Sequence, residues 1–198
     1  FNCITVDGCM STNDSVMLLA NGASRAPLIP SQKSPGFNPG MNAKSCIFGS
    51  GREPRSLDRG APLSGGSNFK KFSFALDKVC LELAKLIVRD AEGGSKFIQI
   101  KVGQARDFSE AKKVALAIAN SNLFKAAVYG ENPNFGRIAA AVGASGVEVK
   151  EKDLKIKVSP LDQNDISVEV SINRGRGSAV IFTSDLTPEY VKINAEYN

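Results

Sequence analysis

The chain has 198 residues, of which 42% are hydrophobic and 23% are charged, and this composition is that of a globular protein with one sizeable core. No apolar run approaches the roughly 20 residues that a membrane-spanning helix needs. The chain contains no histidine, which excludes Ser-His-Asp catalysis, Cys-His catalysis and His-based metal sites within it. If the chain acts as an enzyme, its base is a carboxylate, a lysine or an α-amine, or it lies on another chain.

The net charge of +5 is concentrated in one segment. Between Ala23 and Asn68 there are six basic and two acidic residues, so the rest of the chain is nearly neutral. We therefore expect no basic face on the folded core and no nucleic-acid partner. The four cysteines form no C-x-x-C pair and are interpreted as reduced thiols of an intracellular protein.

The chain opens with a strand-like run, Phe1–Val6, that enters a tight turn at Asp7-Gly8. The polar cluster Ser11–Asp14 follows, and then the run Val16–Ala20, which is apolar enough to be buried on both faces of a sheet. Hydrogen-bonding side chains between two buried segments either lock a turn or line a site. A start on Phe in mid-strand indicates one piece of a larger protein.

Residues 23–68 form a distinct segment that holds six of the nine prolines and many Gly, Ser and Asn residues. The segment shows neither a helical nor an alternating apolar period. A structureless segment of this length is normally functional or disordered, and too few residues precede it to make a separate domain. We interpret it as an inserted Gly/Pro/Ser-rich surface loop within a single domain, 1–198.

A helix is predicted from about Phe69, because apolar residues recur at three- and four-residue spacing and should form one buried stripe. These residues are Phe72, Leu76, Val79, Cys80, Leu83, Leu86 and Ile87. The helix should end near Gly93-Gly94. Phe97–Val102 is then predicted as a strand.

Helices and strands alternate through the remainder of the chain. Asp107–Glu110 resembles a capping box that opens a second helix, and a last helix should start near Thr187-Pro188, with Pro at its first position. A closely packed helix is also predicted at 138–142, strands at 123–128, 154–158, 166–172 and 178–183, and a hairpin at 173–177 between the last two strands. The predicted class is α+β with mixed sheets.

Few polar residues stand out on pattern alone. Glu92 is expected at a helix C-terminus, where an acid opposes the helix dipole, so a functional carboxylate competes there with a solvated cap. Gly130–Gly136 could cradle a phosphate but lacks the Walker lysine pattern, which favours a structural turn. Arg174 and Arg176 are interpreted as solvated charges, and Asn194 would ordinarily be a surface residue.

Four ordered motifs together resemble the ornithine acetyltransferase family, the bifunctional glutamate N-acetyltransferases of arginine biosynthesis. They are Thr5–Asp14 with its Asp-Gly turn, the acid-glycine-lysine segment Arg89–Lys96, the Gly-Glu-Asn-Pro-Asn-Phe-Gly-Arg element within Tyr129–Ile138, and the C-terminal helix within Asp185–Tyr197. The resemblance covers nearly all of the chain outside residues 23–68.

The resemblance implies an N-terminal-nucleophile-like architecture, with mixed sheets layered between helices, and a precursor that cleaves itself into two chains. This sequence would be most of the β chain, with the nucleophilic Thr expected upstream of Phe1. Such a Thr can use its own α-amine as base, which suits a chain without histidine. The implied activity moves an acetyl group from N-acetylornithine to glutamate through an acetyl-threonine, in arginine biosynthesis.

Carried over residue by residue, the resemblance makes Glu92 and Asn194 substrate-binding residues. No catalytic residue is expected in this chain, because the nucleophilic Thr lies upstream of Phe1, and the oxyanion-hole donors and a substrate lysine belong to the other chain. A carboxylate suits the ammonium of ornithine, and an amide can bind both a carboxylate and an amine. No metal or cofactor is implied, and acetyl-CoA is a possible alternative acetyl donor.

The sequence departs from the family pattern at three places. Cys9 stands where Asp is common, Phe135 stands where Trp is common, and residues 23–68 replace a short connection. The first two changes are mild, and the third has no explanation from the sequence.

The interpretation is therefore the β chain of a glutamate N-acetyltransferase. Its expected partner is the α chain of the same precursor, in a higher oligomer of αβ units, in the cytoplasm or, in a eukaryote, in a mitochondrion or plastid. One alternative is an amidohydrolase or aminopeptidase of similar architecture, in which water replaces the acceptor amine. The other is a non-catalytic protein that binds a polyanion through the basic loop.

Overall fold

The computed structural model describes residues 1–9, 15–21, 23 and 67–196. The Ser11–Asp14 cluster and nearly all of the predicted loop 23–68 lie outside these residues. The chain divides into two units, one made of Phe1–Val16 with Val79–Asn198 and the other of Met17–Lys78. In the second unit the structure describes a short segment and the first turns of helix α1 (Ser67–Arg89).

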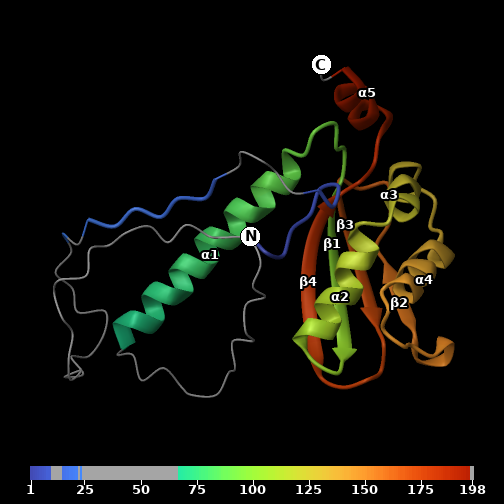
Figure 1. Cartoon of the computed structure of the whole chain (residues 1–198), viewed down its shortest axis with the longest axis horizontal. Helices are drawn as coiled ribbons and strands as arrows, with labels where there is room; N and C mark the ends of the chain where they lie inside the picture. Colours follow the sequence, from blue (N-terminus) through green and yellow to red (C-terminus); the bar gives the residue numbers. More distant parts are fainter. Residues whose placement is uncertain (10–14, 22, 24–66, 197–198) are drawn as a thin grey trace. The chain divides into compact units, whose positions relative to one another are not determined.

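The first unit is built on a four-stranded sheet of order β2-β3-β1-β4 (Figure 1). The central strand β1 (Phe97–Ala105) pairs in parallel with β3 (Asp165–Ser171) and antiparallel with β4 (Gly177–Ser184). The edge strand β2 (Lys155–Val158) pairs antiparallel with β3. The predicted α+β class with a mixed sheet is thus confirmed.

Helix α2 (Phe108–Ala119) packs against β1 and β4, and α3 (Asn122–Tyr129) and α4 (Phe135–Ala144) pack beside it. A 3₁₀ turn, η1 (Glu151–Asp153), precedes β2, and α5 (Pro188–Glu196) follows β4. The N-caps are those that the sequence favours: Asp107 accepts from the Glu110 N–H at 2.8 Å. Pro188 opens α5, as predicted.

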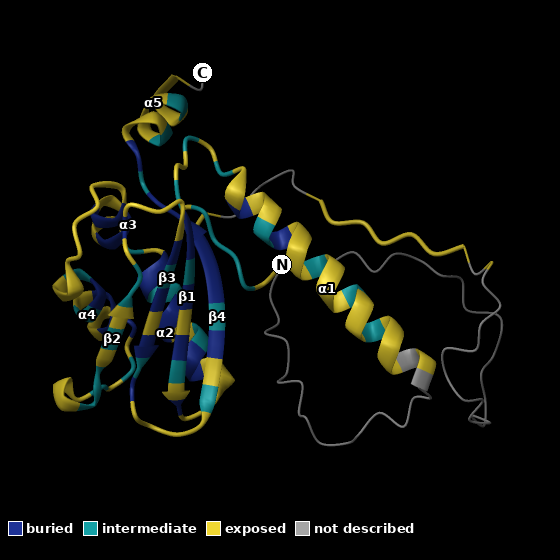
Figure 2. Ribbon diagram, turned by 180° about the vertical axis from the view of Figure 1, so that it is seen from behind, coloured by how far each residue is buried: buried dark blue, intermediate teal, exposed yellow. Residues whose placement is uncertain are grey.

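The main core lies between α2 and one face of the sheet (Figure 2). Alternate residues of β1 point to this face, because side chains along a strand alternate between its two faces. The α2 residues that meet them follow the three- and four-residue spacing of a helix. The fully buried side chains include Ile98, Ile100, Val102, Val114, Ile118, Val168 and Ile181.

The opposite face of the sheet carries a smaller cluster. Phe97 and Phe182 stack with ring centroids 5.5 Å apart, and the buried Val88 of α1 packs against them. Ile4 bridges in parallel to Phe182, so the N-terminal segment adds to the free edge of β4. The expected strand Phe1–Val6 is reduced to this single bridge.

Two predictions, one of a strand and one of a hairpin, are wrong. Residues 123–128 were expected as a strand but lie in helix α3, because Ser121 caps the helix by accepting from the Phe124 N–H and the buried residues follow a helical spacing. Residues 173–177 do not form a hairpin, because β3 and β4 both pair with β1 and their connection crosses its end. The hairpin in this region joins β2 and β3.

Two predicted apolar runs are exposed. Helix α1 forms as expected, but its apolar positions Val79, Leu83, Leu86 and Ile87 are exposed, and it is buried at Ala84 and Val88. Val16–Leu19, expected to be buried on both faces, is exposed and forms no strand. Helical periodicity therefore predicted that α1 forms, but it did not predict whether the apolar side of the helix is covered. Within the described part of the chain, that side is exposed.

Candidate functional site

The segments that the sequence singled out converge where β1 begins and β4 ends. Asp185 follows β4 directly and is only 2% exposed. Its carboxylate accepts hydrogen bonds from the Ser95 N–H at 2.8 Å, the Ser95 hydroxyl at 2.5 Å and the Lys96 N–H at 2.9 Å. Three donors on one buried carboxylate fix the acid-glycine-lysine segment against the start of the C-terminal motif.

Lys96 connects this arrangement to the Gly130–Gly136 loop. Its ammonium forms an ion pair with Glu131 at 2.7 Å and also donates to the Leu161 carbonyl. The lysine side chain is only 9% exposed. Its ammonium is therefore largely shielded from water and needs partners inside the fold. The loop itself is a structural turn, in which Asn134 caps α4 by accepting from the Arg137 N–H at 3.3 Å.

The N-terminal turn reaches the same place. Asp7 accepts from the Cys9 N–H at 2.8 Å, and Gly8 has a positive φ of 83°, which confirms the tight turn. The Tyr190 hydroxyl of α5 donates to the other Asp7 oxygen at 3.0 Å. The Cys9 N–H, with help from Tyr190, lowers the pKa of Asp7, while burial and the Asp7 charge raise the pKa of Tyr190.

Lys125 lies beneath this turn. It is only 3% exposed, and its ammonium donates to the Val6 carbonyl. Burial lowers the pKa of Lys125, and the nearby carboxylates Asp7 and Asp185 partly oppose that effect. Lys125 was not predicted as a site residue, because residues 123–128 were expected to form a strand. The available signal was a lysine in the middle of the apolar run Leu123–Val128.

Glu92 and Asn194, which are 102 positions apart in the chain, are brought into contact. The Asn194 Nδ2 donates to the Glu92 Oε2 at 3.3 Å and to the Tyr190 carbonyl at 2.9 Å. Nδ2 makes both bonds, and the amide oxygen of Asn194, a separate acceptor, makes no hydrogen bond among the described residues. Both side chains are exposed, so they are accessible to a small molecule.

The predicted position of Glu92 at a helix end is wrong. Helix α1 ends at Arg89, and Glu92 lies in the turn beyond it. This turn is held against α5: Thr187 donates to the Gly93 carbonyl at 2.5 Å, and a side chain at Gly93 would come within 2.4 Å of the Tyr190 nitrogen. The tight packing of Gly93, rather than the helix dipole, therefore sets where the Glu92 carboxylate lies.

This end of the sheet thus presents one exposed carboxylate and one amide oxygen beside a network of hydrogen-bonded charged side chains. A carboxylate binds an ammonium group, and an amide oxygen accepts from an amine. Within the described ranges, no three metal-ligating side chains cluster here or elsewhere. The two arginines of the β3–β4 connection lie at the other end of the sheet, and Arg174 is paired with the buried Glu110 at 3.0 Å rather than solvated.

The chain is similar to known proteins over its whole length. The profile of the ArgJ family matches residues 1–161 and 158–198, which together span the chain. A relative from Geobacter sulfurreducens named "Arginine biosynthesis bifunctional protein ArgJ" is 34% identical over the whole chain and 47% of its own length. A "Glutamate N-acetyltransferase" from Methanopyrus kandleri is 38% identical, again over the whole chain and 48% of its own length.

A solved structure is also similar. The crystal structure of the arginine biosynthesis bifunctional protein ArgJ from Bacillus halodurans superposes with a TM-score of 0.75 at 30% identity, covering all of this chain and 87% of that one. The chain therefore spans about half the length of the curated relatives it matches but most of this solved chain.

Proposed function

Because the chain belongs to the ArgJ family, we propose that it is the β chain of a glutamate N-acetyltransferase that acts in arginine biosynthesis. The observation that carries the proposal is the contact between Glu92 and Asn194, since two residues assigned to substrate binding from separate motifs meet at one exposed place. The names of the relatives support the reaction. Their length, about twice that of this chain, supports a second chain from the same precursor.

The proposed reaction proceeds in two transfers. A Thr hydroxyl, placed upstream of Phe1 and activated by its own α-amine, attacks the acetyl carbon of N-acetylornithine. The amide bond breaks, ornithine leaves with the proton, and an acetyl ester remains on the Thr. The amine of glutamate then attacks this ester, which forms N-acetylglutamate and restores the hydroxyl.

In this scheme the residues of this chain bind and orient the substrates. Glu92 pairs with a substrate ammonium, and the Asn194 amide oxygen accepts from the same or a neighbouring amine. The hydrogen bonds of Lys96, Lys125 and Asp185 hold the segments that carry these two side chains. Their role is positioning, because each is buried or engaged within the fold.

The remaining parts of the proposal concern the whole protein. The α chain supplies the oxyanion-hole donors and a substrate lysine, and the αβ units assemble into a higher oligomer. Acetyl-CoA is a possible second acetyl donor, and the cytoplasm is the predicted compartment. Among the described residues, no helix is both long and apolar enough to span a bilayer.

The test uses the intact protein produced from its whole gene. Denaturing mass spectrometry should show two chains, and incubation with N-acetylornithine and glutamate should yield N-acetylglutamate and ornithine in equal amounts. Release of acetate without acetylglutamate would favour the amidohydrolase instead. Salt-dependent binding of a polyanion by a single chain that lacks transfer activity would favour the binding protein.

A further inference from the structure

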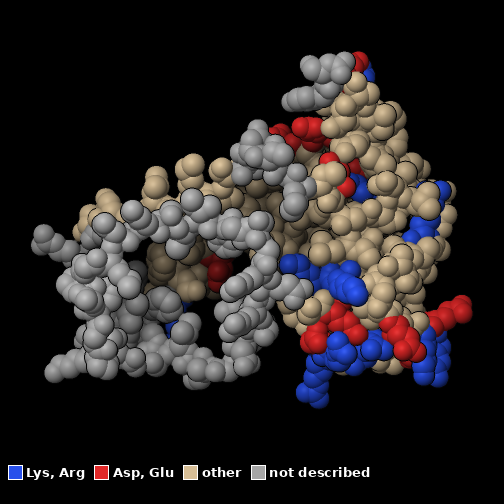
Figure 3. All heavy atoms as spheres, in the orientation of Figure 1, with Lys and Arg blue, Asp and Glu red and all other residues tan. Residues whose placement is uncertain are grey.

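A polar cavity lies at the end of the sheet opposite to Glu92 and Asn194, where β1 and β3 end. Basic and acidic residues gather over this end of the molecule (Figure 3). The cavity has a volume of about 480 Å³, which lies within the roughly 300–1,000 Å³ of small-molecule sites. It is lined by Glu148, Lys150, Asp153, Ile172, Asn173 and Arg174.

The walls of this cavity are held by hydrogen bonds. The Asn173 Nδ2 donates to one oxygen of Asp153 at 2.9 Å, and Asn173 has a positive φ of 49°. The Arg174 guanidinium donates to the Glu148 carbonyl at 2.8 Å and to the buried Glu110 carboxylate at 3.0 Å. The β3–β4 connection is therefore fixed to the segment before β2, and the cavity between them is formed in advance of any ligand.

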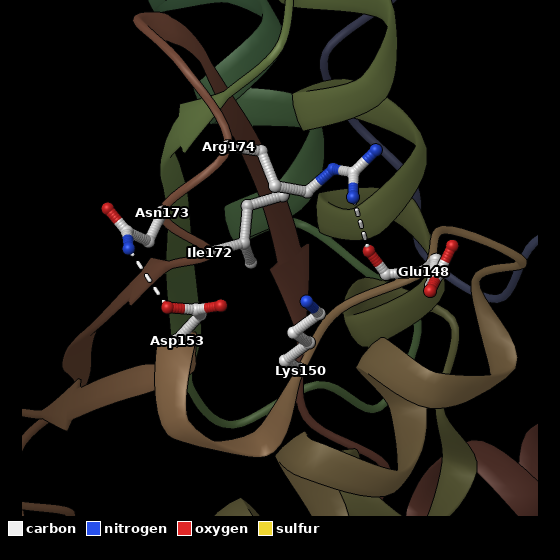
Figure 4. A pocket seen from close by; sticks show the side chains of 6 residues that line it. All are labelled: Glu148, Lys150, Asp153, Ile172, Asn173 and Arg174. Carbon is white, nitrogen blue, oxygen red and sulfur yellow. Dashed lines mark hydrogen bonds between the residues drawn. The ribbon is translucent and has the colours of Figure 1, made fainter.

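Two opposite charges face this space. Figure 4 shows the Lys150 ammonium and the second oxygen of Asp153 directed toward the cavity on either side, with the buried Ile172 between them, while the Glu148 carboxylate points away. Lys150 and Asp153 form no ion pair with each other, and Lys150 forms none with any described residue. The charge of Arg174 is paired with Glu110, whereas the ammonium of Lys150 is available to pair with a ligand.

We propose that this cavity binds the zwitterionic end of an α-amino acid. The ligand carboxylate pairs with Lys150, and the ligand ammonium pairs with the oxygen of Asp153 that receives no bond from Asn173. A zwitterion satisfies both charges at once, whereas a simple anion leaves the Asp153 oxygen unpaired and a simple amine leaves Lys150 unpaired. The site is separate from Glu92 and Asn194 and independent of the proposed acetyl transfer.

The test measures binding of L-alanine to the intact protein by saturation-transfer NMR and by calorimetry. Propionate and ethylamine are the matched probes, because propionate lacks only the amine of alanine and ethylamine lacks only its carboxylate. Alanine should bind at least tenfold more tightly than either probe, since each missing partner removes a charge-assisted hydrogen bond. The Lys150→Met and Asp153→Asn variants should each weaken alanine binding by about tenfold or more.

Two controls separate this site from others. Lys152 belongs to η1, the 3₁₀ turn that also contains Asp153, but its side chain does not line the cavity. Lys152→Met should therefore leave alanine binding unchanged. Glu92→Gln alters the other end of the sheet and should also leave it unchanged. Absence of alanine binding, equal binding of propionate, binding that survives both cavity variants, or loss of binding in Glu92→Gln would each overturn the proposal.

Discussion

The Glu92 carboxylate is the residue on which the proposed substrate binding depends most. We predict that Glu92→Gln weakens transfer by about 1.5 to 3 kcal/mol, or roughly ten- to a hundredfold in kcat/KM, since the amide keeps the shape but loses the charge that pairs with an ammonium. Steady-state kinetics of the intact protein with N-acetylornithine and glutamate measure this change.

Glu82→Gln is the matched control, because Glu82 is an exposed acid of α1 whose ion pair with Lys85 lies within one helix. Such a pair contributes less than about 0.5 kcal/mol, so transfer and stability should hardly change. If both variants behave like the unsubstituted protein, Glu92 is a solvated turn residue and its assignment to substrate binding is wrong.

Lys125 illustrates a different residue-scale effect, since its charge is buried and its ammonium is hydrogen-bonded to a backbone carbonyl. Replacing it with Met leaves the Val6 carbonyl without its donor and the nearby carboxylates Asp7 and Asp185 without a counter-charge. We predict a loss of about 1 to 3 kcal/mol in the free energy of unfolding, measured by urea denaturation. Lys101→Met, at an exposed lysine 3.9 Å from Glu169, should change the stability by less than about 0.5 kcal/mol. Equal effects of the two substitutions would show that the buried bond contributes nothing.

At the scale of elements, the crossing of β1 by the β3–β4 connection depends on a glycine. A Cβ at Gly177 would lie 2.3 Å from the carbonyl carbon of Asp107, so the strand start or the α2 N-cap must shift. We predict that Gly177→Ala lowers the melting temperature, with a loss of about 1 to 3 kcal/mol. Gly103→Ala, in β1 with no atom within 4 Å of the added Cβ, should be neutral or slightly stabilising. A neutral Gly177→Ala would mean that the crossing is looser than the structure shows.

The end of α1 is joined to the start of β3 by a salt bridge between Arg89 and Asp165, with N–O distances of 2.6 and 3.1 Å. The arginine lowers the pKa of Asp165 below its ordinary value of 3.8. A carboxyl with a depressed folded pKa contributes stability above its unfolded pKa and loses it as the pH falls through the folded pKa.

We therefore predict that Asp165→Asn is destabilising at pH 7, and that this difference shrinks below about pH 3.8 as the aspartate is protonated. Both side chains are about half exposed, so the effect at pH 7 should stay below about 1 kcal/mol. Urea denaturation at pH 7 and at pH 2.5 measures it. A difference that is the same at both values would contradict the assignment to this carboxylate.

At the scale of the whole molecule, the exposed apolar side of α1 offers a surface that the proposed second chain can cover. Leu83, Leu86 and Ile87 are 47, 59 and 46% exposed, and adjacent exposed apolar side chains of this size mark an interaction surface. This exposure accords with a chain that spans about half of its curated relatives.

We predict that the chain expressed by itself binds the dye anilinonaphthalene sulfonate more strongly than the intact protein does, because we expect the proposed α chain to cover these side chains. The double substitution Leu83→Gln with Leu86→Gln should lower dye fluorescence of the isolated chain, while circular dichroism reports unchanged helix content. Equal dye binding by the isolated chain and the intact protein would contradict the prediction.

Much of the local structure follows from patterns of neighbouring residues. The period of α1, the Asp107 cap, the Asp7-Gly8 turn and Pro188 at the start of α5 were each predictable, because helix periodicity, caps and turns involve residues close in the chain. The motifs that contain Glu92 and Asn194 were likewise recognisable from the sequence.

Long-range pairing was not predictable from these patterns. The position of β1 between β3 and β4, and hence the failure of the expected hairpin, depends on which strands pair, and every strand offers the same backbone donors and acceptors. The burial of Lys125 against the Val6 carbonyl and the contact between Glu92 and Asn194 were not predictable either. They require segments more than a hundred residues apart to meet, and packing of the whole core, rather than local preference, sets where those segments lie.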